Sequence, residues 1–242
     1  MSIILVGGGP DTVTTPVVFD RFVKEIRNRT GGSRPARIAV VLFDREGSSE
    51  YFLPAYLEPL HSRTPCQLTP VLLRANEPAD PAAFDDVDAI VVGGGPTPDY
   101  LEGLRGSAAA IRAAVAAGAP YLGFSAGAMI APQRALVGGY RILGVEVCSE
   151  ECSEGLDELE VRDGLGLVPF AVDVHAAQAG TLSRAVAAVA EGLVDRAVAV
   201  DENTALVLRH ADLEDLEVIG AGNCWSVRGA GRKATVAVLS AS

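Results

Sequence analysis

A serine stands between two glycines at the end of an apolar run, in Gly123-Phe124-Ser125-Ala126-Gly127. A strand that ends at Phe124, one exposed serine and a helix that opens at Ala126 are typical of a nucleophile elbow, whose sharp turn leaves no room for neighbouring side chains. The elbow would present the Ser125 hydroxyl at the positive end of the helix. We therefore predict Ser125 as a nucleophile, with the Ala126 amide stabilising negative charge on an attacked carbonyl oxygen. The alternative is a small residue in a tight turn.

A second glycine cluster, which includes Gly94 and Gly95, ends the preceding predicted strand. If the two strands are neighbours, the cluster lies beside the elbow. We then expect the Gly94 and Gly95 amides to complete an oxyanion hole and Pro96 to contact the substrate. A phosphate-binding loop is the alternative, but neither this cluster nor residues 7–9 complete GxGxxG or GxxxxGK(S/T). The sequence therefore predicts no cofactor.

Three histidines are candidates for the base that a serine nucleophile needs. His61 is predicted at the end of a surface helix, and His210 at the tip of a hairpin. His175 follows the apolar stretch 167–172 and precedes a helix, which places it at the carboxyl end of a strand, where open α/β sheets have their sites. We therefore predict His175 as the base, with a structural histidine as the alternative.

A carboxylate is also needed, to orient the base and to stabilise the imidazolium that forms. Glu202 lies between two apolar stretches, where a carboxylate without a partner is costly. We therefore prefer Glu202 to the glutamates between positions 146 and 151. Asp173 and Asp201 remain alternatives.

The elements that must position these residues follow from apolar runs that alternate with helix-like segments, as in a mostly parallel sheet flanked by helices. The predicted strands are Ile3–Val6, Arg37–Phe43, Gln67–Leu73, Ala89–Val92 and Pro120–Phe124, and the predicted helices are Val17–Arg29, Tyr51–Leu60 and Ser107–Ala117. After residue 193, short strands predict an antiparallel C-terminal extension of the same sheet. These are Ala197–Val200, Ala205–Leu208, Glu217–Ile219, Cys224–Val227 and Thr235–Leu239. With no repeat or long linker, residues 1–242 are predicted to be a single α/β domain.

The composition narrows the class of protein. With 242 residues, 49% of them hydrophobic, the chain can bury a substantial core. We find no apolar run of membrane-spanning length and no secretory signal, so we expect a cytoplasmic protein with no membrane partner. The formal charge of −11 argues against a nucleic-acid partner and favours a small molecule or peptide. The four cysteines have neither disulfide-framework nor metal-site spacing, so no metal is predicted. A homodimer is an assembly that the sequence allows.

Three motifs occur together with VVGGGPT: GFSAGA around Ser125, VDVH around His175 and VDENTA around Glu202. Together they resemble the cyanophycinase and aspartyl dipeptidase (peptidase E-like) family of serine peptidases. The resemblance covers most of the chain. It implies a flavodoxin-like three-layer α/β fold similar to class I glutamine amidotransferases, with Ser125 as nucleophile, His175 as base and Glu202 as carboxylate. The dipeptidase branch carries an aspartate where this chain has Tyr140, which favours Glu202.

The chain departs from this family where the substrate would bind. Cyanophycinases have Asp-Gln-His-Phe followed by arginines that bind aspartyl carboxylates. Here Val174 separates Asp173 from the histidine, and Ala179 and Thr181 stand where arginines are expected. We expect Asp173 and Arg184, the cation that remains, to contact the substrate, and acidic substrates to bind poorly.

Residues 146–163 form an acidic segment with eight carboxylates and one arginine. It is interpreted either as a solvated loop or as a negatively charged lid that attracts cationic substrates. For the whole chain, we predict a serine hydrolase that cleaves an amide or isopeptide bond in a small peptide-like molecule through an acyl-enzyme. The alternatives are an acyltransferase that passes the same acyl group to an amine, and a catalytically silent binding protein on the same fold.

Overall fold

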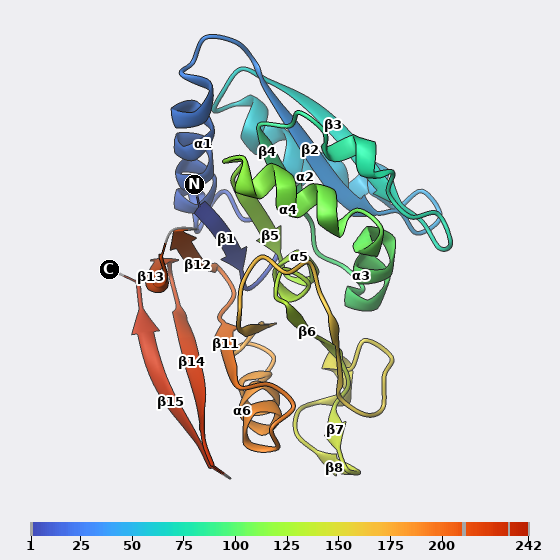
Figure 1. Ribbon diagram of the computed structural model, residues 1–242, viewed down its shortest axis with the longest axis vertical. Coiled ribbons are helices and arrows are strands. Elements are labelled where there is room, and N and C mark those ends of the chain that lie inside the picture. Colours follow the sequence, from blue (N-terminus) through green and yellow to red (C-terminus); the bar gives the residue numbers. More distant parts are fainter. Residues whose placement is uncertain (1, 210–211, 232, 242) are drawn as a thin grey trace.

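The central sheet of the computed structural model has seven strands (Figure 1). They are β1 (Ser2–Val6), β2 (Ala36–Phe43), β3 (Cys66–Leu73), β4 (Ala89–Val92), β5 (Tyr121–Phe124), β12 (Thr204–Arg209) and β13 (Asp212–Gly220), in the order β13-β12-β1-β5-β4-β2-β3. The five strands from β1 to β3 in this order pair in parallel, and β12 and β13 are antiparallel at the β1 edge. Parallel pairing brings the carboxyl ends of β1, β4 and β5 to one edge of the sheet. The structure describes residues 2–209, 212–231 and 233–241.

A second sheet of four strands lies below the first in Figure 1. It contains β10 (Ala171–Val174), β11 (Arg196–Val200), β14 (Asn223–Ala230) and β15 (Lys233–Ser240), in that order. Here β10 and β11 are parallel, and the remaining pairs are antiparallel. Between β5 and β10 the chain forms two short antiparallel pairs. The first pairs β6 (Arg134–Gly138) with β9 (Glu160–Asp163), and the second pairs β7 (Arg141–Ile142) with β8 (Val145–Glu146).

Helices cover both faces of the central sheet, because successive side chains of a strand point to opposite faces. On one face, Ile4 and Val6 of β1 pack with α1 (Pro16–Thr30) and α2 (Ser49–His61). On the other face, Ile3 and Leu5 belong to a core that includes α3 (Thr97–Arg105) and α4 (Ala108–Ala116). The remaining helices are α5 (Ala126–Met129), α6 (Leu182–Ala190) and the 3-10 turns η1 (Pro81–Phe84) and η2 (Glu150–Cys152).

The predicted fold class is confirmed: a mostly parallel sheet flanked by helices, with antiparallel strands toward the C-terminus. The prediction that all the late strands extend one sheet is wrong, because β11, β14 and β15 belong to the second sheet. The physical reason is that β1 has one free edge, which β12 takes, whereas β11 pairs with β10. Helix α3 was not among the predicted helices, although Thr97 and Pro98 at its start are typical of a helix N-terminus.

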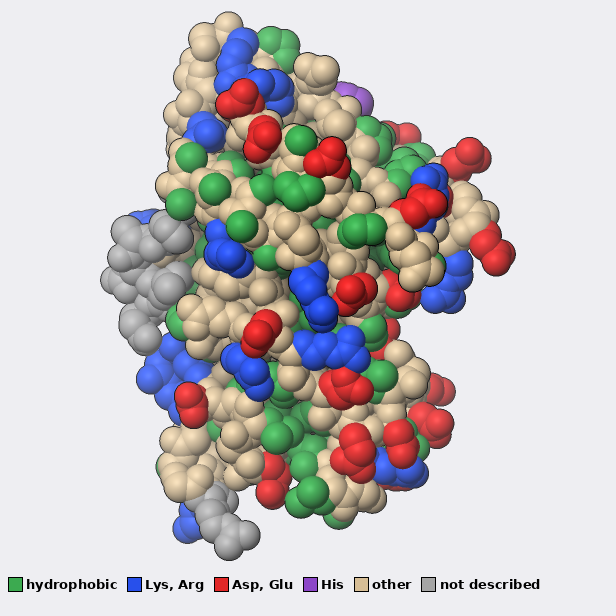
Figure 2. All heavy atoms as spheres, turned by 45° about the vertical axis from the view of Figure 1, so that its right-hand side comes forward, with side chains coloured by type: hydrophobic (Ala, Val, Ile, Leu, Met, Phe, Trp, Pro, Cys, Tyr) green, Lys and Arg blue, Asp and Glu red, His purple; other side chains and the backbone are tan. Residues whose placement is uncertain are grey.

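The net charge of −11 arises from 31 acidic and 20 basic side chains, so both signs are present. Figure 2 shows acidic side chains gathered over the lower part of one face, with basic side chains among them. Ion pairs join side chains of opposite charge: Arg141, for example, pairs with Glu146 and with Asp157. Within the described residues, no helix is both long and apolar enough to cross a membrane.

Candidate active site

The turn from β5 into α5 holds Ser125 in a strained conformation. Ser125 has φ 46° and ψ −107°, outside the regions that a non-glycine residue ordinarily adopts. A Cβ on Gly123 would lie 2.4 Å from the Gly127 carbonyl oxygen, and a Cβ on Gly127 would lie 2.4 Å from that of Val92. Both flanking glycines are therefore required for the close approach of chain segments, as in a nucleophile elbow.

Ser125, His175 and Glu202 form a continuous chain of hydrogen bonds. Ser125 Oγ lies 3.0 Å from His175 Nε2, and His175 Nδ1 lies 2.8 Å from Glu202 Oε1. The His175 side chain is 31% exposed and that of Glu202 is 44% exposed, so the site is open to small molecules. With a proton on Nδ1 donated to Glu202, the His175 Nε2 lone pair faces the serine hydroxyl and can accept its proton.

The three side chains come from both sheets and meet at the carboxyl end of β1. The Ser125 amide donates to the Val6 carbonyl, and the His175 amide donates to the Gly7 carbonyl at 2.9 Å. His175 follows β10 and Glu202 follows β11, two parallel strands of the second sheet. The end of β1 thus sets the relative positions of the serine and the histidine.

A match to a family model shows to which family the chain belongs. The model of peptidase family S51 matches residues 60–216, which include all three residues of the hydrogen-bonded chain. The chain belongs to peptidase family S51. This membership makes it a serine peptidase or hydrolase and agrees with the family resemblance of its motifs.

Two solved structures of proteins named as peptidases have the same fold. A peptidase from an acI-B1 Actinobacterium is 19% identical with a TM-score of 0.73, over 100% of this chain and 94% of that one. A putative peptidase E protein from Listeria monocytogenes EGD-e is 17% identical with a TM-score of 0.55, over 91% of this chain and 98% of that one. A comparison with curated protein sequences gives no match.

The glycine cluster after β4 lies against Ser125. A Cβ on Gly94 would come 3.1 Å from the Ser125 Cβ. The Gly94 amide, however, donates to the Tyr56 hydroxyl oxygen at 3.0 Å, so the predicted role of Gly94 as an oxyanion donor is corrected to that of leaving room for the serine. The Gly95 amide donates to no partner within the described residues, and the Ala126 amide is the first of its helix and so has no partner inside it. Within the described residues, these two amides are therefore free to donate to a ligand.

A helix opens at Ala126, as predicted, but it is short. It ends at Met129 after one turn, and Pro132 pairs with Val168 in an isolated bridge. Proline disfavours helical conformation in the residue before it and cannot donate an amide, which explains the early end. A one-turn helix has little macrodipole, so stabilisation of an oxyanion falls to individual amides.

Asp173 and Arg184 do not face the substrate, which corrects the prediction that they bind it. The two side chains are buried and form a bidentate pair, with Nε to Oδ2 at 2.8 Å and Nη2 to Oδ1 at 2.6 Å. Arg184 also donates to the carbonyls of Gly139 and Cys152. Burial opposes the charge on the guanidinium, but Asp173 outweighs it and raises the pKa of Arg184. The pair fastens α6 and β10 to the acidic segment.

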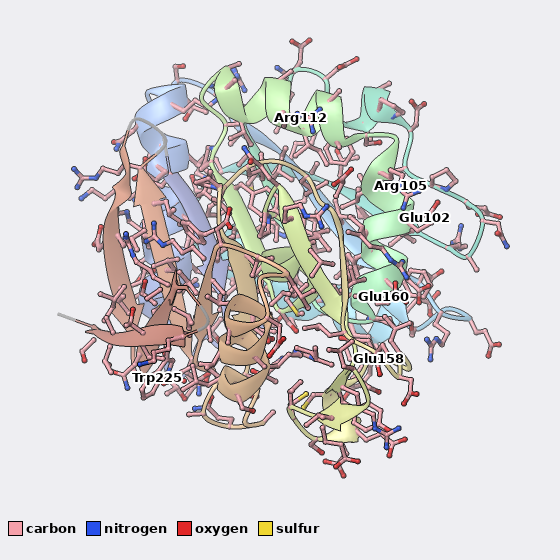
Figure 3. The ribbon with its side chains drawn as sticks, turned by 60° about the horizontal axis from the view of Figure 1, so that its bottom comes forward. Glu102, Arg105, Arg112, Glu158, Glu160 and Trp225 are labelled. Atoms are coloured by element: carbon pink, nitrogen blue, oxygen red, sulfur yellow. The ribbon has the colours of Figure 1, made fainter. Side chains whose placement is uncertain are left out.

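Asp201, the other alternative carboxylate, is a structural anchor next to Glu202. Its buried side chain accepts from the amides of Ala177 and Asn223 and from Nε1 of Trp225 (labelled in Figure 3). These bonds fix the loop that carries Glu202. Gln178, which sequence reasoning missed, adds to this by accepting from the Glu202 amide at 2.9 Å.

The remaining predicted residues differ in how close they lie to Ser125 and His175. His61 is exposed at the end of α2, as predicted, and His210 lies outside the described residues. Pro96 is half-buried next to Gly95 and before α3, so it remains a candidate for substrate contact. Within the described part of the chain, no group of three or more His, Cys, Asp or Glu side chains is arranged to hold a metal ion.

Two further features of the S51 site were missed in the sequence. The loop after β1 lies against the carboxylate, since a Cβ on Gly8 would come 3.3 Å from the Glu202 Cγ. Tyr56 reaches the glycine cluster from α2. The signal for the first was the position of Gly7 and Gly8 directly after the first strand, where a parallel sheet has its sites. Tyr56 has no comparable signal.

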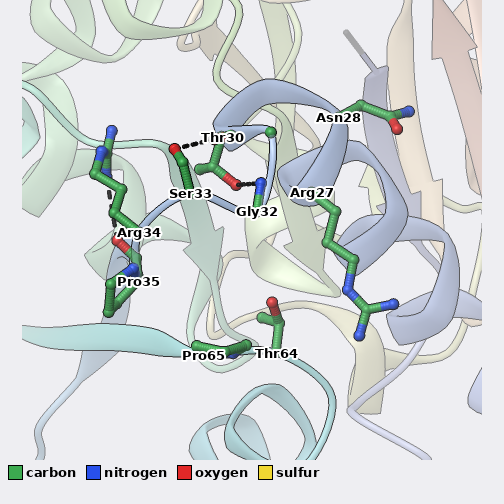
Figure 4. A pocket seen from close by; sticks show the side chains of 10 residues that line it. Arg27, Asn28, Thr30, Gly32, Ser33, Arg34, Pro35, Thr64 and Pro65 are labelled. Atoms are coloured by element: carbon green, nitrogen blue, oxygen red, sulfur yellow. Dashed lines mark hydrogen bonds between the residues drawn. The ribbon is translucent and has the colours of Figure 1, made fainter.

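A surface hollow elsewhere on the molecule does not belong to this site. Figure 4 shows it, lined by residues that include Arg27, Ser33, Arg34 and Pro65. Ser33 and Arg34 precede β2, and Pro65 precedes β3, so the hollow lies at the amino ends of parallel strands. The hydrogen-bonded chain of Ser125, His175 and Glu202 lies at their carboxyl ends, on the opposite edge of the sheet.

Proposed function

We propose that the protein hydrolyses an amide or isopeptide bond in a small peptide-like substrate through an acyl-enzyme on Ser125. The observation that carries this proposal is the hydrogen-bonded chain from Ser125 Oγ through the His175 ring to Glu202 Oε1, at 3.0 and 2.8 Å. Membership in a serine peptidase family supports it. The motifs of the chain favour a cyanophycinase-like enzyme whose specificity pocket differs from that of cyanophycinases.

In the acylation step, Ser125 Oγ attacks the substrate carbonyl carbon while His175 Nε2 takes the hydroxyl proton. The carbonyl oxygen gains negative charge, which the Gly95 and Ala126 amides are placed to stabilise. Glu202 stabilises the imidazolium that forms. As the tetrahedral intermediate collapses, the C–N bond breaks and His175 gives its proton to the leaving amine.

In the deacylation step, a water molecule replaces the amine in the same geometry. His175 Nε2 accepts one water proton as the oxygen attacks the ester carbon, and the second tetrahedral intermediate forms. Its collapse breaks the bond to Ser125 Oγ, which recovers the proton from His175. The products are a free carboxylic acid and the unchanged serine. Resolution of the same ester by an amine would make the protein an acyltransferase instead.

Covalent labelling tests this function directly. A fluorophosphonate should add to the wild-type protein with loss of fluoride and modify the peptide that contains Ser125. Ser125→Ala should show no adduct, and His175→Ala should react slower by several orders of magnitude, because the residues act as a unit. Equal labelling of wild type and Ser125→Ala would contradict the proposal. An unlabelled but folded wild type would favour a silent binding protein.

If the wild-type protein reacts with the fluorophosphonate, incubation of fresh, unlabelled enzyme with a library of dipeptides and amides would separate the two enzymatic alternatives. Hydrolysis produces free acids and amines, whereas acyl transfer produces new amides only when an amine acceptor is added. Mass spectrometry distinguishes the two sets of products. Ser125→Ala serves as the matched control for both reactions.

A further inference from the structure

The acidic segment crosses close to the catalytic residues and contacts both sides of the site. On one side, Thr97 Oγ1 donates to Glu154 Oε1 at 3.1 Å, and Thr97 is two residues beyond the oxyanion donor Gly95. On the other side, Cys152 Sγ lies 3.7 Å from the Ala179 carbonyl oxygen. Ala179 in turn donates its amide to the His175 carbonyl at 2.8 Å. The segment therefore passes from the oxyanion side to the side of the base.

Most carboxylates of the acidic segment already have strong partners within it or next to it. Glu158, labelled in Figure 3, accepts from the amides of Leu143 and Gly144. Ion pairs hold four others: Glu146 and Asp157 with Arg141, Glu160 with Arg162, and Asp163 with Arg134. These carboxylates therefore have their cationic or amide partners within the segment or next to it.

Glu154 differs from these carboxylates in its partner and its surroundings. Its partner is the neutral Thr97 hydroxyl, and it forms no ion pair with any lysine or arginine that the structure describes. Burial raises its pKa, although Thr97, Arg184 and His175 favour its ionised form. The charge of Arg184 is already matched by Asp173. An added positive group would therefore supply the direct ionic partner that this carboxylate lacks.

The position of Glu154 suits a group close to the bond that is cleaved. Thr97, the partner of Glu154, is two residues from Gly95 in the chain. The Cα atoms of Thr97 and Gly95 are therefore at most about 7 Å apart. An α-ammonium group or a short amine side chain of a dipeptide reaches across such a distance. On the opposite side, Ala179 and Thr181 offer no cation to a substrate carboxylate, and the guanidinium of Arg184 is buried.

We propose that Glu154 is a specificity-determining residue that binds an ammonium group of the substrate next to the carbonyl attacked by Ser125. This inference rests on the proposed serine hydrolase function and names its substrate class, small amides with a free amine close to the scissile bond. Thr97 orients the carboxylate, and the rest of the acidic segment holds it in place. Glu154 does not take part in the chemical steps.

A matched pair of covalent probes tests the inference without knowledge of the natural substrate. One probe is a diphenyl α-aminoethylphosphonate with a free ammonium group, and the other is its N-acetyl counterpart. In both, Ser125 Oγ attacks phosphorus, phenoxide leaves, and the adduct is followed by intact mass. The wild type should react faster with the free amine, and high salt should reduce that preference.

Glu154→Gln should lower the labelling rate of the free-amine probe by about tenfold to a hundredfold and leave the N-acetyl probe unchanged. The Gln side chain retains an oxygen that can accept from Thr97, so the segment keeps its anchor. Glu151→Gln is the matched control in the same segment and should change neither rate. Thr97→Val should weaken the preference by releasing the carboxylate.

Three outcomes would overturn the inference. An equal loss on both probes would show that Glu154 only holds the segment in place, and unchanged rates would show that no ammonium group uses it. A wild type that reacts with neither these probes nor a fluorophosphonate would remove the serine nucleophile and with it both proposals. Fluorophosphonate labelling that persists in Glu154→Gln separates a failure of the specificity assignment from a failure of the proposed function.

Discussion

At the scale of single residues, the site depends on two side chains held in unusual backbone conformations. Ser125 has φ 46° and His175 has φ 57°, both positive. Such conformations cost about 1–3 kcal/mol each and persist only where surrounding contacts fix them. Here the amides of both residues bond to the end of β1, at Val6 and Gly7. These backbone conformations direct the two side chains toward each other at the edge of the sheet.

Glu202 should contribute through its charge as well as its position. Glu202→Gln can keep a hydrogen bond to His175 but loses the charge that stabilises the imidazolium, so we expect the rate of acylation of Ser125 to fall by about two to four orders of magnitude. The measurement is the rate of acylation by a fluorophosphonate, with Glu150→Gln as an exposed carboxylate control. If Glu202→Gln reacts as fast as wild type, Glu202 is not the third member of the triad.

The sequence predicted the three residues of this chain because each depends on a local pattern. Ser125 was found from its flanking glycines and His175 from its place after an apolar stretch. The assignments of Gly94, Asp173 and Arg184 were wrong because they depend on tertiary partners. Their neighbours Tyr56, Gly139 and Cys152 are distant in sequence, so neither spacing nor composition indicates which polar groups are already satisfied.

At the scale of elements, the buried pair of Asp173 and Arg184 should determine whether α6 and the acidic segment stay in place. Arg184→Met leaves the Asp173 carboxylate buried without its cation, and we expect the free energy of unfolding to fall by about 3–5 kcal/mol. Chemical denaturation monitored by circular dichroism measures this loss. The exposed substitution Arg105→Met on α3, whose side chain is 60% exposed, is the control and should cost little.

A double-mutant cycle separates the pair from the shape of its side chains. Replacement of both partners, Asp173→Leu with Arg184→Met, removes the two charges together and should recover much of the stability lost in either single variant. Single and double variants with equal losses would show that packing, and not the ion pair, holds these elements together.

Element boundaries were predicted well where apolar runs are long and poorly where the chain crosses between sheets. Strand β4 matches its predicted range, and β2 and β3 each begin one residue before their predicted starts. The excursion from residue 131 to 170 contains only short strand pairs, such as β7 with β8. This excursion separates β10 and β11 from the central sheet. No periodic pattern indicates that separation, because it depends on which strand edges remain free.

At the scale of the whole molecule, acidic conditions should weaken the fold through carboxylates whose ionised form the structure favours. Burial opposes the charge on Asp88, but Arg34 and the Arg37 amide outweigh it and hold its pKa below the ordinary value. The Ser49 amide, followed by Arg74, likewise lowers the pKa of Asp44. Both carboxylates connect β2 or its flanking loops to other elements.

The sign of the pH dependence follows from these lowered pKa values. A carboxyl group that is more acidic in the folded chain contributes stability above its unfolded pKa, about 3.9 for aspartate, and loses it as the pH falls through the folded value. We therefore expect the contribution of Asp44 and Asp88 to Tm to be constant near neutral pH and to disappear below about pH 4. Glu154 has a raised pKa, so its contribution to stability changes with pH in the opposite direction.

Asp88→Asn provides the test of this contribution. It should lower Tm at pH 7, because Arg34 loses its carboxylate partner, and the difference from wild type should shrink as the pH falls from 4 to 2. Asp86→Asn is the matched control two residues away, since the Asp86 side chain is 85% exposed and lies 4.0 Å from Arg37. Thermal scans of the three proteins between pH 2 and pH 7 measure the effect. A constant difference between Asp88→Asn and wild type across this range would mean that the Asp88 position acts through packing or neutral hydrogen bonds, since only a titrating charge loses its contribution on protonation.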